Sequence, residues 1–165
     1  MPDAPGLYGI YGSRETWEEL QLDCENEQLS HYVGKAEDSL GRELQTPSAT
    51  GRTASSTIRR SFAALLRDSL DLRGQPRNLA KPERFANFGL AQLDDQRLTD
   101  WMHRHLRLAV WIKPPGVELH RIETDVIRAW RPPLNIAKNP YPLATLRRAR
   151  KAMADDARAW AERKR

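Results

Sequence analysis

The segment from Glu118 to Trp130 constrains the fold of this chain more than any other. At about 100° of rotation per residue, its apolar side chains fall on one stripe, as expected of a helix with one buried face. These side chains are Leu119, Ile122, Val126, Ile127 and Trp130. Pro132 and Pro133 end the helix, because proline lacks a backbone N–H and restricts the residue before it.

One charged residue, Glu123, falls inside this apolar stripe, whereas Arg121 and Asp125 fall outside it. A carboxylate that faces inward is costly unless a cation or hydrogen-bond donors meet it. Glu123 therefore either forms an internal ion pair with an arginine, reaches solvent at the edge of the stripe, or serves as a metal or catalytic ligand set against a sheet. The spacing alone does not choose among these.

Further elements follow from short apolar runs and capping residues. Strands are predicted at residues 6–11, 30–35 and 108–112. Helices are predicted at 14–22 and 38–45, after a cap at Ser55 or Ser56, from a cap at Thr99 through Leu106, and from Pro142 onward. Residues 72–87 are expected to be irregular. This order predicts an α+β (or α/β) fold with a small mixed or antiparallel central sheet flanked by helices.

Length and composition bound the class of protein. A chain of 165 residues is long enough for one ordinary core. No apolar run approaches the roughly 18 residues of a membrane span, and the first residues do not resemble a secretory signal. With Cys24 as the single cysteine, no internal disulfide can form. We therefore expect a cytoplasmic protein in a reducing compartment, with no membrane partner.

The positive charge is concentrated near the C-terminus. The chain has 27 basic and 22 acidic residues, and residues 141–165 hold eight basic and three acidic ones, so this segment carries the whole net charge of +5. We predict a basic C-terminal helix at 141–165 that packs on or extends the domain formed by residues 1–140 and contacts a polyanion through Arg147 and Arg148. The alternative is a solvated terminal helix.

Five short motifs follow one another in a characteristic order. They are Gly6-Leu7-Tyr8, Tyr32-Val33-Gly34-Lys35, the helical Arg42, Glu123 followed by Val126-Ile127, and Pro132-Pro133-Leu134-Asn135. Each is weak alone, but together, from Gly6 to Asn135, they resemble the GIY-YIG nuclease family. The resemblance implies that residues 1–140 form a GIY-YIG-like nuclease domain, a DNA endonuclease that hydrolyses phosphodiester bonds.

The resemblance also implies roles around the reacting water. Tyr8 would be the general base or would hold the water, Tyr32 would orient it, and Lys35 would assist near the nucleophile. Gly34 would permit a close approach of the backbone where a side chain would block it. Because tyrosine has a reference pKa of about 10, nearby positive charge is needed to make it a useful base.

The remaining implied roles concern charge on the phosphate. Arg42 would neutralise the phosphate, and Asn135 would hold the site together by hydrogen bonds. Glu123 would be the single protein carboxylate on one Mg²⁺ (or Mn²⁺), an ion that keeps several waters and can be anchored by few protein ligands.

A second basic element and the tryptophans lie outside these motifs. Arg52, Arg59 and Arg60 accompany hydroxyl residues before and in the helix after Ser56, and we expect them to contact DNA phosphates. The alternative is an ordinary capped helix with an exposed basic face. Trp101, Trp111 and Trp130 lie in patterned segments and are expected in the core rather than as base-stacking platforms.

Some alternatives stay open. Gly9-Ile10-Tyr11 also matches the first motif, although Tyr11 points to the opposite strand face from Tyr8. Residues 14–28 lengthen the gap between the tyrosine motifs, and Gln45-Thr46-Pro47 lacks the histidine that often follows the helical arginine. A non-catalytic nucleic-acid-binding module is therefore the second hypothesis, and a protein-interaction domain the third. The expected partner is DNA, with RNA left open, and the expected state is a monomer or a transient homodimer.

Overall fold

A computed structural model describes residues 2–23, 28–80 and 84–164, which form two compact units. The first unit comprises residues 1–45 and 105–143, and the second comprises residues 46–104 and 144–165. No helix within the described ranges is long and apolar enough to cross a membrane.

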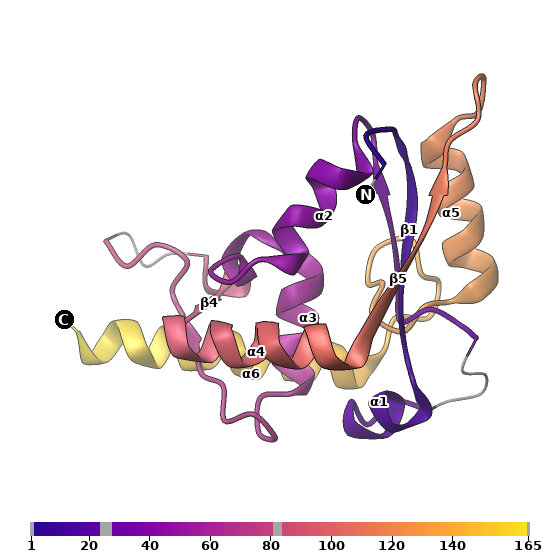
Figure 1. Cartoon of the computed structure of the whole chain (residues 1–165). Coiled ribbons are helices and arrows are strands. Elements are labelled where there is room, and N and C mark those ends of the chain that lie inside the picture. The colour runs from indigo at the N-terminus through magenta and orange to yellow at the C-terminus, as the bar shows by residue number, and fades with distance from the viewer. Residues whose placement is uncertain (1, 24–27, 81–83, 165) are drawn as a thin grey trace. The chain divides into compact units, whose positions relative to one another are not determined.

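The first unit is built on a three-stranded antiparallel sheet. Strand β1 (Gly6–Gly12) lies between β2 (Tyr32–Ala36) and β5 (Leu106–Ile112), so β2 and β5 are the edges (Figure 1). Tyr8 pairs with Gly34 on one side and with Val110 on the other. The expected strands and the expected fold class, an α+β fold with a small antiparallel sheet flanked by helices, are therefore confirmed.

Helices pack on this sheet where the apolar pattern predicts them. Helix α5 (Leu119–Trp130) packs against β2 and β1, and it ends at Arg131, which adopts a left-handed conformation before the proline pair. Helix α1 (Arg14–Glu19) is capped by Ser13, whose side chain accepts a hydrogen bond from the backbone N–H of Thr16. Helix α2 (Leu40–Ser48) begins in this unit and buries Leu40 and Leu44.

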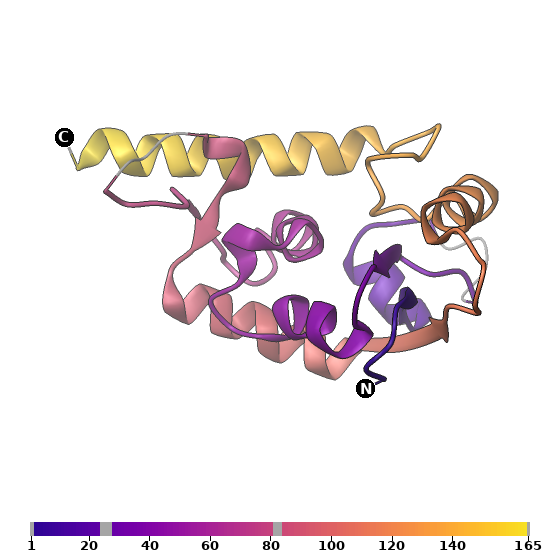
Figure 2. The same cartoon turned by 90° about the horizontal axis from the view of Figure 1, so that it is seen from above.

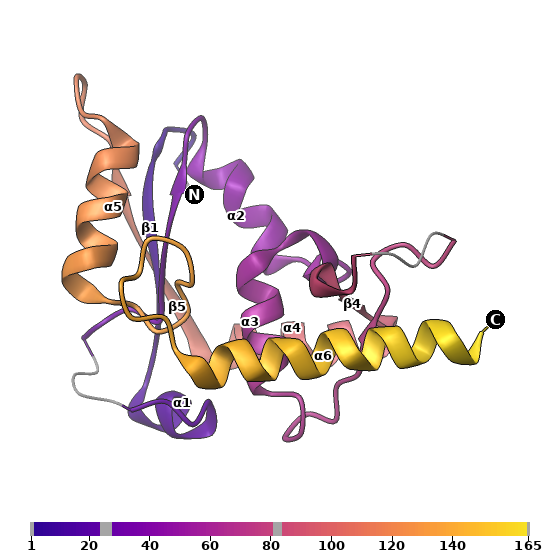
Figure 3. The same ribbon diagram turned by 180° about the vertical axis from the view of Figure 1, so that it is seen from behind.

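The second unit is mostly helical. Helices α3 (Thr57–Leu65) and α6 (Ala144–Arg163) pack against each other, as Figures 2 and 3 show. A two-stranded ribbon joins β3 (Gly74–Gln75) to β4 (Gly89–Leu90), with the short 3₁₀ turns η1 (Thr53–Ser55) and η2 (Phe85–Asn87) beside it. The irregular segment predicted at 72–87 includes residues 81–83, which lie outside the described residues.

One predicted helix start is wrong. Helix α4 spans Gln92–His105, so Thr99 lies inside it rather than at its cap. The hydroxyl of Thr99 donates to the carbonyl of Asp95, four residues earlier, a bond typical of a helix interior. The acidic residues Asp94 and Asp95 in the first turn, which favour a helix N-terminus, were the sequence signal for the true start.

Candidate active site

Two tyrosines on neighbouring strands face each other on one side of the sheet. Tyr8 lies on β1 and Tyr32 on β2, and their ring centroids are 6.1 Å apart with the planes tilted by 39°. The two phenols are hydrogen-bonded to each other. Tyr11 differs from Tyr8 by three positions on the same strand and so points to the opposite face. The geometry thus brings Tyr8, and not Tyr11, together with Tyr32.

Gly34 makes room for this pair. It lies directly opposite Tyr8 in the strand register and two residues after Tyr32. A Cβ atom at position 34 would lie 2.5 Å from the phenolic oxygen of Tyr8 and 2.9 Å from Cε1 of Tyr32. The missing side chain therefore leaves the space that the Tyr8 ring occupies, which is why only glycine fits this position without a shift.

Glu123, on α5, carries a buried carboxylate. The side chain is 8% exposed, and its negative charge acts on Tyr8 and on Tyr32. Its partner is the ammonium group of Lys138, from the loop after α5, rather than the arginine that the sequence suggested. Lys138 is 26% exposed and also lies 3.3 Å from Nδ1 of His120, so the ion pair borders solvent.

Asn135 fixes the edge of β2 between Tyr32 and Gly34. Its side-chain oxygen accepts a hydrogen bond from the backbone N–H of Val33 at 2.9 Å, and its amide nitrogen donates to the Val33 carbonyl at 2.8 Å. The backbone N–H of Leu134 donates to the carbonyl of His31 at 2.9 Å. The segment after the proline pair thus pairs with the strand that carries Tyr32, and it satisfies an edge that would otherwise be open.

Burial determines the protonation of the tyrosine pair. Burial is the largest cause that raises the pKa of Tyr8 above its usual value, followed by the neighbouring Tyr32 and the charges of Glu43 and Glu123. The pKa of Tyr32 is also raised, again chiefly by burial. Both phenols therefore carry their protons at neutral pH unless positive charge is brought to them.

Of the residues expected near the tyrosines, Lys35 is not brought to the pair, and no described contact joins Arg42 to it. Lys35 alternates with Gly34 along β2, so it points to the opposite face, where its ammonium group pairs with Glu37. The Arg42 side chain is exposed on α2, and no described residue forms a hydrogen bond or ion pair with its guanidinium group. Glu43, the next residue, does act on both phenols, but no periodicity distinguished it in the sequence.

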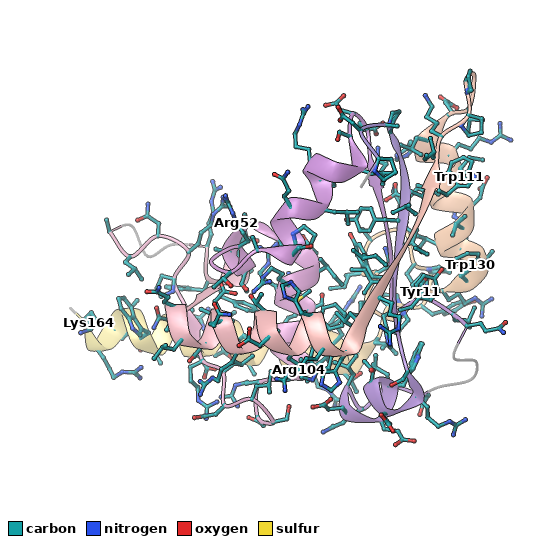
Figure 4. The ribbon with its side chains drawn as sticks, viewed as in Figure 1. Tyr11, Arg52, Arg104, Trp111, Trp130 and Lys164 are labelled. Carbon is teal, nitrogen blue, oxygen red and sulfur yellow. The ribbon has the colours of Figure 1, made fainter. Side chains whose placement is uncertain are left out.

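The opposite face of the sheet carries aromatic residues at an apolar hollow. This hollow has a volume of about 340 Å³ and lies between the sheet and α5; its lining includes Leu7, Tyr11, Val33, Trp111, Ile122, Val126 and Trp130. Trp111 is 40% exposed and Trp130 44% exposed (Figure 4), so the expectation that both are core residues is wrong. Trp111 is exposed because β5 is an edge strand, whereas Trp101 is buried as expected.

The residues expected to contact phosphates all belong to the second unit and divide into two groups. Arg52, Arg147 and Arg148 are exposed. Arg59 is fully buried, where its guanidinium group pairs with Asp95 and donates to the Thr99 hydroxyl at 2.8 Å. Arg60 is only 7% exposed. Arg59 is therefore enclosed and cannot meet a phosphate as expected, and the alternative of an exposed basic face on α3 is not seen, because backbone oxygen atoms hold both side chains inward.

The site fits a cation that needs few protein ligands. Among the described residues, no group of three or more His, Cys, Asp or Glu side chains is arranged to hold a metal ion. Glu123 offers one carboxylate beside the phenols, and its Oε2 atom is the oxygen bonded to Lys138. A hard divalent ion that retains most of its waters is compatible with this donor set, whereas a fully protein-ligated ion is not.

Comparison with known proteins gives one match. A family model described as the GIY-YIG catalytic domain matches residues 6–153, which is most of the chain. No curated protein and no solved structure matches the chain.

Proposed function

From the premise that this chain belongs to the GIY-YIG family, a family of nucleases, we propose that it is a divalent-metal-dependent DNA endonuclease that uses a tyrosine-activated water. The observation that carries the proposal is the pairing of Tyr8 and Tyr32 over Gly34, with the negative charge of Glu123 acting on both phenols. Buried titratable groups that perturb one another are typical of catalytic sites.

Tyr8 is the proposed base because it is the more buried phenol and lies over Gly34. Once the phenol has given its own proton to solvent, its oxygen takes a proton from the attacking water. The water oxygen bonds to phosphorus as the bond to the leaving sugar oxygen breaks, and that oxygen takes a proton from solvent. Since burial and Glu43 and Glu123 oppose the loss of the phenol proton, that step requires positive charge nearby. With both phenols protonated, the Tyr8 hydroxyl donates to the Tyr32 oxygen. Once Tyr8 has lost its proton, the Tyr32 hydroxyl donates to the Tyr8 oxygen or to the water, and Asn135 keeps the strand of Tyr32 in place.

Glu123 is the proposed ligand of one Mg²⁺ or Mn²⁺ ion. When bound, the ion supplies positive charge that opposes the charge developing on the phosphate and lowers the pKa of nearby acids. Arg42, exposed on α2, is proposed to neutralise the scissile phosphate in the same way. Lys35 has no part in this proposal, because it points away from the tyrosines.

The second candidate is a module that binds DNA but does not cleave it. The ion pair between Lys138 and Glu123 supports it, because an ammonium group already neutralises the proposed metal ligand. The two candidates differ in one property. A nuclease would hold a divalent ion on this carboxylate, in place of Lys138 or through the oxygen that Lys138 does not bond, whereas a binding module would keep the Lys138 pair alone.

Supercoiled plasmid distinguishes these candidates. Wild-type protein should nick plasmid in Mg²⁺ or Mn²⁺ and stop when a chelator is added. Glu123→Gln should reduce nicking by about 100-fold or more, because it removes the negative charge that anchors the ion. Asp125→Asn, an exposed position on the same helix, should leave the rate unchanged. Equal rates for Glu123→Gln and wild type, with both proteins folded, would reject the metal site, and DNA binding without cleavage would favour the second candidate.

A further inference from the structure

Three arginines gather in the second unit where α3, α6 and the segment after β3 meet. They are Arg60 on α3, Arg77 after β3, and Arg150 on α6. The backbone of β3 lies directly on α6: a Cβ atom at Gly74 would collide with the carbonyl of Met153. Arg77 lies three residues after Gly74, and Arg150 lies about one helical turn before Met153, so both can reach the same region.

The packing of α6 on α3 and β3 brings the segments that carry these arginines together, and the charges of Arg150 and Arg77 act on Arg60. Burial, together with the positive charges of Arg150 and Arg77, lowers the pKa of Arg60 to about 10. Burial also lowers the pKa of Arg150. Like charges that are partly removed from water repel strongly, so this arrangement is costly as it stands.

Arg60 is held in a fixed position within this group. Its Nη1 atom donates to the carbonyls of Ala54 at 2.8 Å and Thr53 at 3.3 Å, and its Nη2 atom donates to the Thr57 hydroxyl at 3.1 Å. Its Nε atom is buried and has no hydrogen-bond partner among the described residues. Arg60 therefore presents a donor that the protein itself does not satisfy, from a side chain that is already ordered.

No carboxylate compensates this charge within the described residues. Two of the three acidic residues of α6 are paired elsewhere, Asp155 with Lys151 and Arg158, and Asp156 with Arg67; the third, Glu162, lies more than three helical turns after Arg150. None of the arginines of the cluster forms an ion pair with a described residue. A site with several guanidinium donors and no acid matches a phosphate group, which accepts hydrogen bonds from the planar guanidinium fork.

We propose that Arg60, Arg77 and Arg150 form a phosphate-binding subsite for the nucleic-acid backbone, located in the unit that does not carry the tyrosine pair. The identification of the polyanion as nucleic acid rests on the proposed nuclease function. Arg60 is the fixed element of the subsite, and Arg77 and Arg150 close on the phosphate. Such contacts position a nucleic acid and carry no sequence information by themselves.

The test is binding of a short fluorescein-labelled DNA duplex in a chelator, measured by fluorescence anisotropy between about 50 and 200 mM salt. The test variant is Arg77→Gln combined with Arg150→Gln, which spares the buried Arg60. It should bind at least about 10-fold more weakly, and the slope of log affinity against log salt should fall by about one. Arg158→Gln is the matched control, because this arginine of the same helix is already paired with Asp155. It should bind like wild type.

Plasmid nicking by the same preparations separates this proposal from the nuclease proposal. If wild type nicks DNA and the double variant binds like the Arg158→Gln control, the subsite is wrong and the nuclease stands. If wild type does not nick but the double variant loses affinity and salt dependence, the subsite stands and the nuclease fails. No binding by wild type at low salt would overturn the subsite. The subsite would also be wrong if inorganic phosphate raised the melting temperature of wild type but not of the double variant, while both proteins bound DNA equally well. The three arginines would then bind a free anion and not the nucleic acid.

Discussion

Substitution of Gly34 by alanine tests whether the position of the Tyr8 phenol matters. The new Cβ atom would lie 2.5 Å from the phenolic oxygen, and ordinary contact begins at 3.4 Å. The phenol must therefore retreat by roughly 1 Å, because the obstacle is a backbone-anchored methyl group on a paired strand. No rotation of the alanine side chain relieves the clash.

Two effects of this displacement can be measured. Overpacking of a buried ring costs about 1–3 kcal/mol of unfolding free energy. A reacting group that is misplaced by about 1 Å loses about 100-fold in rate. We therefore expect Gly34→Ala to remain folded, with a modestly lower urea midpoint, and to nick supercoiled plasmid about 100-fold more slowly than wild type.

A glycine in the other unit provides the control. A Cβ atom at Gly89, on β4, would lie 3.3 Å from the Cβ of Ala54, so its neighbour needs to move by only a few tenths of an ångström. Gly89→Ala should therefore keep the wild-type nicking rate. The reasoning is refuted if Gly34→Ala also nicks at the wild-type rate, because the placement of the phenol would then not limit the reaction.

Asn135→Ala removes both hydrogen bonds to the backbone of Val33 and leaves that buried N–H and C=O unsatisfied. Urea unfolding should show a loss of about 2–4 kcal/mol, and a loss near zero would contradict the edge-holding role. Burial lowers the pKa of His31 from 6.5 to about 4, so as pH falls through this window the unfolded chain binds a proton that the folded protein does not. The unfolding free energy should therefore decrease by about 2 kcal/mol between about pH 7.5 and pH 5. His31→Gln should flatten that part of the stability curve, and an unchanged pH dependence would disprove the assignment.

The sequence predicted the parts of this site that periodicity controls. The strands of Tyr8 and Tyr32 have short patterned runs, and their pairing puts the two rings on one face because side chains alternate. Glu123 was identified as an inward-facing carboxylate because its helix has a clear apolar stripe, and the structure buries it. The choice between Tyr8 and Tyr11 also followed from alternation along a strand.

The partners of these groups could not be predicted, because they come from segments without periodicity. Lys138 reaches Glu123 from a loop. Glu43 lies on an exposed part of α2 beside the arginine that the motif emphasised. A charged residue such as Arg59 is expected at the surface. It is buried because its guanidinium group pairs with Asp95 on α4, which lies 36 residues later in the chain. Long-range pairing of this kind leaves no local signal in one sequence.

The exposure of Trp111 was missed for a different reason. Its strand has the same run of apolar residues as a buried strand. Only the strand order shows that β5 is an edge, and the order depends on contacts between segments that lie about a hundred residues apart in the chain.

The most direct test of the account is a comparison of plasmid nicking by Tyr8→Phe and Tyr11→Phe in saturating Mg²⁺. Both variants lose one hydroxyl from the same strand, on opposite faces of the sheet. The account predicts that Tyr8→Phe nicks at least about 100-fold more slowly than wild type while Tyr11→Phe keeps the wild-type rate. Wild-type activity in Tyr8→Phe, or its loss in Tyr11→Phe alone, would contradict it.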